Sequence, residues 1–238
     1  MVAVIPMAGR GSRYAKEGYH TPKPLIEIGG RPMIYWALKS LEGVQLSRMV
    51  FVMLREHEMQ FQVRAMLTTM VQQPVSFVML DEVTDGQLCT VLAAKEFMDE
   101  KEDVLVAASD TWVQSRLGED VLHQQVDGMI SVANLPGEQW SFARTDEAGR
   151  VVEVAEKVRI SDQASTGLYY FRRAGDLIRF GEEMITRKEK TRGEYYVIPV
   201  YQKMINAGLH IGISKASAMW DMGTPEAKAS FEHYLSTR

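Results

Sequence analysis

A glycine-rich, positively charged segment near the N-terminus carries the clearest chemical signal in this sequence. Residues 5–13 (IPMAGRGSR) follow an apolar, β-branched run, residues 2–5, that suits a buried strand. Gly9 and Gly11 lack a Cβ atom, so backbone N–H groups in this segment can converge on phosphate oxygens. Four cations add positive charge to the same region: Arg10, Arg13, Lys16 and Lys23. The segment predicts a phosphate-binding loop, with a simple tight turn after the first strand as the alternative.

A lysine between two prolines strengthens this interpretation. Lys23 lies in the run Pro22-Lys23-Pro24, where the fixed φ angles of the prolines hold it in a stiff, extended segment. The loop is not the dinucleotide pattern G-x-G-x-x-G, because Tyr14 stands where the third glycine belongs, and it is not G-x-x-x-x-G-K-[ST]. The combination indicates a polyanion site of another type.

These motifs resemble those of the sugar-phosphate nucleotidyltransferases, which condense a nucleoside triphosphate with a sugar 1-phosphate and release pyrophosphate. That family opens with a strand, a glycine-rich loop ending in Gly-Ser/Thr-Arg, and a downstream Pro-Lys-Pro-Leu. The resemblance, which runs from residue 4 to about residue 226, implies that Arg13 grips the leaving phosphates and Lys23 the reacting one. It also implies that Gly86 and Gln87 read the base, where Gln87 can both donate and accept. The loop residues expected to bind the nucleotide are Ala8, Gly9, Gly11 and Ser12.

Two aspartates far apart in the sequence are the candidate metal ligands. Asp110 follows the strand-like run 103–108, and open α/β sheets place ligands beyond the carboxyl ends of their strands. Asp221 precedes the turn into the last helix, and the resemblance gives both aspartates the role of holding a divalent ion. Such a pair of hard oxygen donors suits Mg²⁺, which keeps water and phosphate ligands. A capping role is the alternative for Asp110.

The resemblance further implies an acceptor site in the second half of the chain. Glu156 would accept hydrogen bonds from sugar hydroxyls, Lys157 would pair with the acceptor phosphate, and Gly167 would let the backbone approach the ring. Val158 stands where the family has proline, a departure that concerns this acceptor pocket. Glu194 would lie near the acceptor, or it could serve only as a first-turn carboxylate that interacts with a helix dipole.

Strand-like and helix-like patterns alternate along the chain, which is typical of a doubly wound sheet. The strand-like runs are 2–5, 49–54, 75–80, 103–108, 129–135, 166–171 and 209–213, and the helix-like runs are 33–41, 56–71, 87–98, 175–187, 195–207 and a last helix capped by Thr224. Two short alternating segments around residues 146–149 predict a β-hairpin. We therefore expect an α/β fold with a Rossmann-like, doubly wound, mixed and mainly parallel sheet, and a small hairpin subregion for the acceptor, as in GT-A-like proteins.

One domain is expected over residues 1–238, with a nucleotide-binding half (1–136) and a half (137–238) that binds the acceptor and supplies the second metal ligand. A net charge of −4 argues against nucleic-acid and membrane-surface partners, which would require a basic face. The single cysteine, Cys89, excludes an internal disulfide, and no apolar run approaches the length of a membrane span. These features predict a cytoplasmic protein, and they leave a homo-oligomer open.

The reaction these residues suggest is direct in-line attack of an acceptor phosphate oxygen on the α-phosphorus of a nucleoside triphosphate, without a protein nucleophile. Three alternatives remain. The acceptor could be a non-sugar phosphate such as phosphocholine, receiving a cytidylyl group. The protein could be a glycosyltransferase, although Asp110-Thr111-Trp112 lacks the second carboxylate of an Asp-x-Asp motif. It could also be a nucleotide-binding regulator without catalytic activity.

Overall fold

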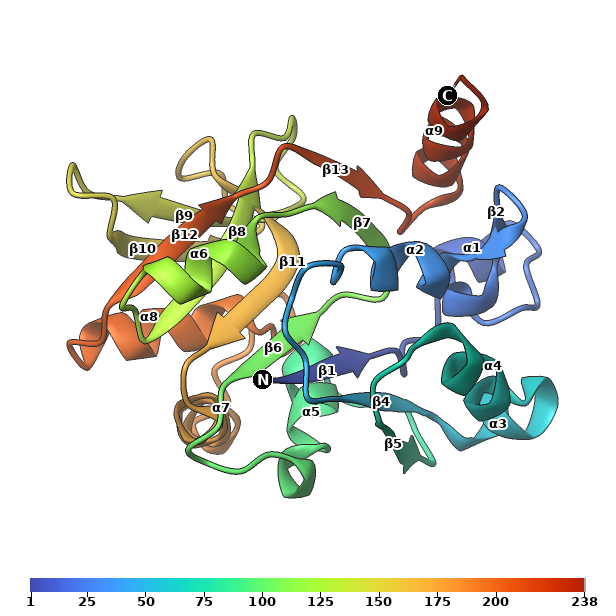
Figure 1. Cartoon of the computed structure of the whole chain (residues 1–238), viewed down its shortest axis with the longest axis horizontal. Helices are drawn as coiled ribbons and strands as arrows, with labels where there is room; N and C mark the ends of the chain where they lie inside the picture. The colour runs from blue at the N-terminus through green and yellow to red at the C-terminus, as the bar shows by residue number, and fades with distance from the viewer. Residues whose placement is uncertain (238) are drawn as a thin grey trace.

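A nine-stranded mixed sheet forms the centre of the structure, a computed structural model that describes residues 1–237 (Figure 1). Its strands are β1 (Val2–Pro6), β4 (Arg48–Leu54), β5 (Val75–Leu80), β6 (Val104–Ala107), β8 (Gly128–Ala133), β9 (Ser141–Thr145), β10 (Val151–Glu156), β11 (Ala164–Phe171) and β12 (Ile211–Lys215). The order is β10-β9-β11-β6-β1-β4-β5, and β8 pairs with both β11 and β12. Strands β6, β1, β4 and β5 are parallel, whereas β11 is antiparallel to its neighbours.

Helices cover both faces of this sheet. They are α1 (Ser12–Lys16), α2 (Met33–Lys39), α3 (Arg55–Phe61), α4 (Val63–Met70), α5 (Gln87–Leu92), α6 (Leu117–His123), α7 (Ala174–Thr186), α8 (Ile198–Asn206) and α9 (Pro225–Ser236), with 3₁₀ turns η1 (Lys23–Leu25) and η2 (Lys95–Phe97). Two small antiparallel pairs complete the fold: β2 (Glu27–Ile28) with β3 (Arg31–Pro32), and β7 (Thr111–Gln114) with β13 (Ala218–Asp221).

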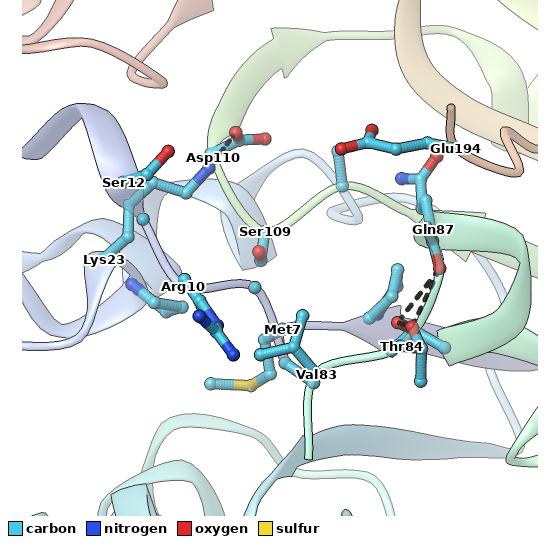
Figure 2. Close-up of a pocket in the computed structure, with 18 of the residues that line it drawn as sticks. Met7, Arg10, Ser12, Lys23, Val83, Thr84, Gln87, Ser109, Asp110 and Glu194 are labelled. Atoms are coloured by element: carbon cyan, nitrogen blue, oxygen red, sulfur yellow. Dashed lines mark hydrogen bonds and ion pairs between the residues drawn. The ribbon is translucent and has the colours of Figure 1, made fainter. Parts of the chain in front are cut away.

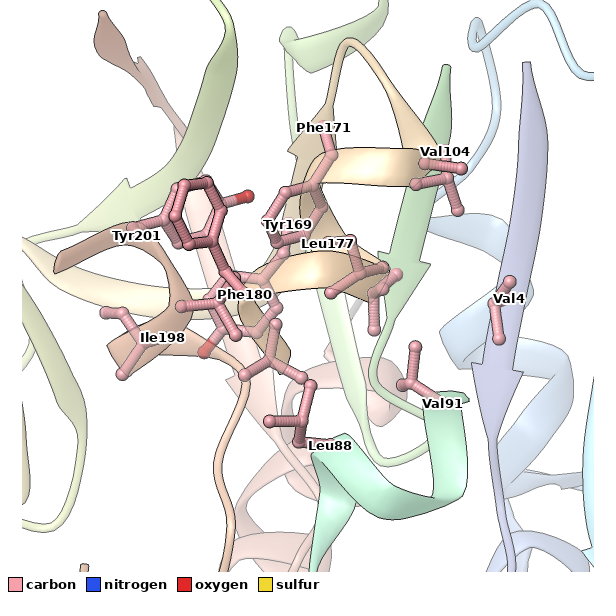
Figure 3. Close-up of a cluster of buried hydrophobic side chains, with 14 of the residues drawn as sticks. Val4, Leu88, Val91, Val104, Tyr169, Phe171, Leu177, Phe180, Ile198 and Tyr201 are labelled. Carbon is pink, nitrogen blue, oxygen red and sulfur yellow. The ribbon is translucent and has the colours of Figure 1, made fainter. Parts of the chain in front are cut away.

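Alternate side chains of the central strands enter two separate hydrophobic clusters, because successive residues of a strand point to opposite faces. Val2 and Val4 of β1 belong to the cluster formed with α5, α7 and α8, part of which Figure 3 shows. Ala3 and Ile5 belong to the cluster formed with α2, α4 and α6. The apolar, uninterrupted sequence of β1 therefore reflects burial on both faces, and it fixes the loop that follows the strand.

A third hydrophobic cluster lies apart from the sheet and joins the two ends of the chain. Its fully buried members are Tyr14, Ile26, Ile28, Met33, Met222 and Phe231. Aromatic contacts extend it: the rings of Trp220 and Tyr234 stack at 4.4 Å, and those of Trp112 and Phe231 lie 5.5 Å apart. Figure 1 shows the C-terminal helix α9 near β2, and the two elements are in contact, so α9 supports the N-terminal part of the chain.

Several elements differ from the expectations in ways that have clear physical causes. The single helix expected over residues 56–71 is two helices, because Gln62 adopts a left-handed backbone with φ 51° and ends α3. Met59, which would continue the apolar stripe of Val63 and Leu67 in a single uninterrupted helix, is 78% exposed, because the break ends that stripe. The expected helix 195–207 begins only at Ile198, since the backbone of Tyr195 is paired with Asp85 and Leu88.

The β-hairpin at residues 146–149 is confirmed, formed by β9 and β10. It is not set apart from the sheet, because β9 pairs with β11 and extends the main sheet at one edge. Among the helices within residues 1–237, none combines the length and the apolar character needed to cross a membrane.

Candidate active site

A pocket of about 540 Å³ opens beyond the carboxyl ends of β1 and β6, the edge where open α/β sheets bind ligands. Its volume lies in the range of small-molecule sites. Nine of the residues expected to contact substrates line it: Ala8, Gly9, Gly11, Ser12, Lys23, Gly86, Gln87, Asp110 and Glu194. Figure 2 shows Ser12, Lys23 and Asp110 on one side of this space, and Gln87 and Glu194 on the other.

The glycine-rich loop forms one wall of the pocket. It leaves β1 with the N–H of Met7 donating to the carbonyl of Val52, 2.8 Å away. Gly11 has a φ of 60°, and a Cβ atom there would lie 3.0 Å from the Cβ of Lys23, so glycine allows the lysine segment to pack directly on the loop. A Cβ atom on Gly9 would meet nothing within 4 Å. Gly11 therefore has a structural reason to be glycine, whereas Gly9 faces open space.

Lys23 and Asp110 form an ion pair on the same side of the pocket as Ser12. The lysine Nζ lies 2.6 Å from Asp110 Oδ2, and the two side chains are 22% and 26% exposed. Burial by itself would raise the pKa of Asp110, but the charges of Lys23 and Arg13 outweigh it and hold this pKa below its ordinary value. The carboxylate is therefore ionised, and it lies where an anionic ligand and a cation could meet.

Asp221 lies beside Asp110 although 111 positions separate them. Strand β13 pairs with β7 so that Asp221 is opposite Thr111, and the N–H of Met222 donates to the carbonyl of Asp110 at 2.8 Å. A Cβ atom on Gly223 would lie 3.0 Å from Asp221 Oδ1 and 3.3 Å from Asp110 Oδ2. Burial and the negative charge of Asp110 raise the pKa of Asp221. The repulsion between the two carboxylates favours a cation between them.

The donor chemistry of this pair fits Mg²⁺. Within residues 1–237 no group of three or more His, Cys, Asp or Glu side chains is placed to hold a metal ion. Two carboxylates cannot complete a protein cage for Ca²⁺ or a tetrahedral site for zinc. Mg²⁺ characteristically takes one or two carboxylates and completes its octahedron with water and phosphate oxygens. Asp110 and Asp221 are the residues that would hold such an ion.

Gly86 and Gln87 lie on the opposite wall, at the start of α5. A Cβ atom on Gly86 would lie 2.5 Å from the carbonyl oxygen of Tyr195, and the glycine φ is 135°, so this position excludes other residues. The hydroxyl of Thr84 donates to the Gly86 carbonyl at 2.9 Å and lies 2.6 Å from the hydroxyl of Thr90. This bonding fixes the turn, and Figure 2 shows the Gln87 side chain in the pocket.

The residues expected at the acceptor side form a connected polar network. Glu156 is buried and accepts a hydrogen bond from Ser141, while Lys157 Nζ donates to the hydroxyl of Tyr196 and lies 4.4 Å from the centre of its ring. Burial raises the pKa of Glu156, and the Ser141 hydrogen bond and the Lys157 charge partly offset this increase. Burial and a hydrogen bond with Glu194 raise the pKa of Tyr196, which therefore stays protonated. Tyr196 and Glu194 both line the pocket and connect the network to it.

Five of the expected residues are not among those that line the pocket: Arg13, Glu156, Lys157, Gly167 and Asp221. Arg13 acts through its charge on Asp110 and Asp221. Gly167 has a φ of 87°, and a Cβ atom there would lie 2.7 Å from the Cβ of Ala108. A glycine at this position therefore has a packing reason, because it lets β11 approach the end of β6.

Two polar residues of the network were not expected from the sequence. Tyr196 follows Glu194 by two positions but belongs to no motif with recognisable chemistry. Ser141 lies directly opposite Glu156 in the pairing of β9 with β10. The register of the hairpin could have identified this serine, whereas only the folded chain brings Tyr196 to Lys157.

A pocket at this edge of a mixed α/β sheet, lined by a glycine-rich loop and an ion pair, has the groups needed to hold a phosphate-bearing ligand, and comparison with known proteins gives the family. A family model described as nucleotidyl transferase matches residues 2–234. The chain belongs to this family. A solved structure of a nucleoside-diphosphate-sugar pyrophosphorylase from Vibrio cholerae RC9 has a TM-score of 0.83 and 29% identity, covering 98% of this chain and 100% of that one.

The chain is also similar to curated proteins over most of its length. The bifunctional protein GlmU of Thermotoga petrophila is 26% identical over 210 residues, covering 83% of this chain and 43% of its own length. This chain therefore spans less than half of that relative. The UTP–glucose-1-phosphate uridylyltransferase AglF of Haloferax volcanii is 24% identical over 250 residues, covering 99% of this chain and 96% of the relative.

Proposed function

We propose that the protein transfers a nucleotidyl group from a nucleoside triphosphate to a sugar 1-phosphate, giving a nucleotide-activated sugar and pyrophosphate. The observation that carries this proposal is that a glycine-rich loop and the Lys23–Asp110 ion pair line one pocket, with the carboxylate of Asp221 beside Asp110. Family membership and the curated relative that acts on UTP and glucose 1-phosphate support it. In this reaction two anionic substrates, the triphosphate and the sugar 1-phosphate, are brought together, and one anion, pyrophosphate, leaves.

Each charged group has a defined part in this proposal. The loop N–H groups, Arg13 and Lys23 stabilise the negative charge that grows on the leaving pyrophosphate. Lys157 attracts the acceptor phosphate, whose oxygen attacks the α-phosphorus on the side opposite the leaving group. Holding both substrates in line supplies much of the rate, because a bimolecular encounter becomes effectively unimolecular. Magnesium bound by Asp110 and Asp221 would neutralise phosphate charge and polarise the α-phosphoryl group.

The two sides of the pocket suggest how the substrates divide it. Residues 1–136 supply the phosphate loop, Asp110 and the base-reading turn at Gly86 and Gln87, so we assign the nucleotide to this half. Residues 137–238 supply the Glu156–Lys157–Tyr196 network and Glu194, so we assign the acceptor to the other half. Glu156, which is buried, and Glu194, which is exposed at the pocket, are suited to accept hydrogen bonds from acceptor hydroxyls.

A second candidate differs only in the acceptor: cytidylyl transfer to a non-sugar phosphate such as phosphocholine. The observation that favours it is local. Lys157, with a φ of 56°, is followed by an exposed valine where the family motif has proline, so this part of the acceptor side departs from the sugar-phosphate pattern. The phosphate-handling half would be unchanged.

The test is a pyrophosphate-release assay with Mg²⁺, in which ATP, CTP, GTP and UTP, and additionally dTTP, are each paired with a panel of sugar 1-phosphates and with phosphocholine. We expect one triphosphate and one sugar 1-phosphate to give release far above all other pairs. Release only with CTP and phosphocholine would establish the second candidate instead. Absence of release with every pair, while a triphosphate still binds, would leave a nucleotide-binding regulator and remove the proposed activity.

A further inference from the structure

Tyr14 is a buried polar residue that the proposed reaction does not use. It follows Arg13 on α1 and is 1% exposed, at the base of the glycine-rich loop. Its hydroxyl donates to the carbonyl oxygen of Met222 at 2.7 Å and lies 2.9 Å from that of Thr224. These contacts link positions more than 200 residues apart, so they join the N-terminal loop to the C-terminal part of the chain.

The peptide that Tyr14 contacts belongs to the segment that carries Asp221. The N–H of Met222 donates to the carbonyl of Asp110, and the carbonyl of the same residue accepts from Tyr14. Asp221 Oδ1 accepts from the N–H of Gly223 at 2.9 Å. Met222 is therefore held from two sides. Its N–H is held by the carbonyl of Asp110, and its carbonyl is held by Tyr14, which follows the cationic loop.

We propose that Tyr14 is a positioning residue that sets the carboxylate of Asp221 relative to Asp110 and to the cationic loop. This inference rests on the proposed function, in which the two aspartates hold a divalent ion. Partners that orient metal-binding side chains without touching the metal commonly change metal affinity or activity 10–100-fold when they are removed. Tyr14 has the required connection, because its hydrogen bonds reach the residues on the C-terminal side of Asp221.

Packing alone is the competing explanation, and one variant separates the two. The Tyr14 ring belongs to the third hydrophobic cluster and meets the ring of Tyr19 edge to face, with centroids 5.1 Å apart. Tyr14→Phe keeps this ring and removes only the hydroxyl. If the ring were all that mattered, metal binding would not change.

The experiment titrates Mn²⁺, as a paramagnetic substitute for Mg²⁺, into the protein without substrates and follows the free ion by electron paramagnetic resonance. For Tyr14→Phe we expect Mn²⁺ affinity to fall about tenfold. In the turnover assay, we expect kcat to fall by a similar factor while the KM for the acceptor changes less than twofold. Tyr19→Phe is the matched control, since it removes a hydroxyl from a more exposed neighbour in the same segment, and it should leave both values unchanged.

A stability-matched control removes the remaining ambiguity. Phe180→Leu trims a buried ring in the cluster on one face of the main sheet, so it should lower Tm without changing Mn²⁺ affinity. Wild-type affinity and wild-type kcat in Tyr14→Phe would overturn the positioning role, even with the proposed activity intact. The Mn²⁺ titration needs no turnover, so failure of the proposed activity would be recognised separately.

A measurement on the wild-type protein covers the case in which Tyr14→Phe does not fold. Amide hydrogen exchange is followed with and without Mn²⁺. The positioning role predicts that the ion slows exchange both in residues 222–224 and in α1, because the tyrosine hydroxyl connects them. Slowing confined to residues 222–224 would contradict the proposal.

Discussion

Replacing Lys23 with methionine removes the ammonium group that lies 2.6 Å from Asp110 and leaves a carboxylate beside that of Asp221 without its closest cation. Breaking a fully buried ion pair costs about 3–5 kcal/mol, whereas an exposed pair contributes about 0–1 kcal/mol. The two side chains here are 22% and 26% exposed. We therefore expect a loss of about 1–3 kcal/mol in the free energy of unfolding.

We expect Lys23→Met to reduce kcat more strongly than it reduces the free energy of unfolding. Lys23 is proposed to stabilise charge that develops in the transition state, and removing one such group commonly lowers kcat about 10²–10³-fold. The assay measures urea unfolding and pyrophosphate release on the same preparations. Lys95→Met is the matched control, because the Lys95–Glu182 pair has a similar separation, 2.9 Å, but both side chains are about half exposed. It should change the unfolding free energy by less than about 0.5 kcal/mol and leave kcat intact.

A double variant tests the cause of the instability. Adding Asp110→Asn to Lys23→Met removes the unpaired carboxylate, so it should restore at least half of the lost stability without restoring turnover. A Lys23→Met protein with wild-type kcat would refute the role of this lysine in phosphate chemistry. A double variant no more stable than Lys23→Met alone would refute the electrostatic explanation.

Four further predictions separate structural from chemical roles. Gly86→Ala should lower the free energy of unfolding by about 1–3 kcal/mol or more, because the φ of 135° at Gly86 and the 2.5 Å approach to the Tyr195 carbonyl oxygen exclude a Cβ atom. Gly9→Ala should leave Tm nearly unchanged, because its Cβ atom would enter open space. That Cβ atom would lie in the pocket wall, so the variant should weaken nucleotide binding in a calorimetric titration. Burial raises the pKa of Glu156 above its ordinary value near 4.5. The KM for the acceptor should therefore rise as the pH falls through a range above 4.5, because the carboxylate becomes protonated. Glu156→Gln should abolish this inflection in the pH profile of KM. The folded state then binds this proton more tightly than the unfolded chain, so the wild type should lose stability relative to Glu156→Gln as pH rises through the same range, which thermal melts at several pH values would detect. Removing divalent ions with EDTA should abolish pyrophosphate release and added Mg²⁺ should restore it, whereas undiminished release in EDTA would exclude the assigned metal role.

Local patterns were enough to predict most of the sheet. The apolar β-branched runs became strands β1, β4, β5 and β6, and the Thr224 cap with Pro225 begins α9 as expected, with the threonine side chain accepting from Ala227 N–H. These features depend on neighbours in the sequence, so the sequence reveals them. The shape of the glycine-rich loop was equally accessible, because glycines widen and a Pro-Lys-Pro run restricts the backbone locally.

Long-range pairing was the part that local patterns could not predict. The small β7–β13 pair brings Asp221 next to Asp110, yet each strand has four residues and little periodicity. The meeting of Tyr196 with Lys157 depends on the folding of two distant segments, and Tyr14 was noted only as the residue in place of a glycine. The break at Gln62 was missed because a left-handed glutamine leaves no signature in the apolar stripe.

The stereochemistry at phosphorus tests the central claim most directly. With the active substrate pair identified, the enzyme is given the triphosphate that carries sulfur at the α-phosphorus in a single configuration, and the configuration of the product is determined by ³¹P NMR. Direct in-line attack by the acceptor phosphate predicts inversion at the α-phosphorus. Retention would contradict the account, because it would require a covalent nucleotidyl–enzyme intermediate and a protein nucleophile.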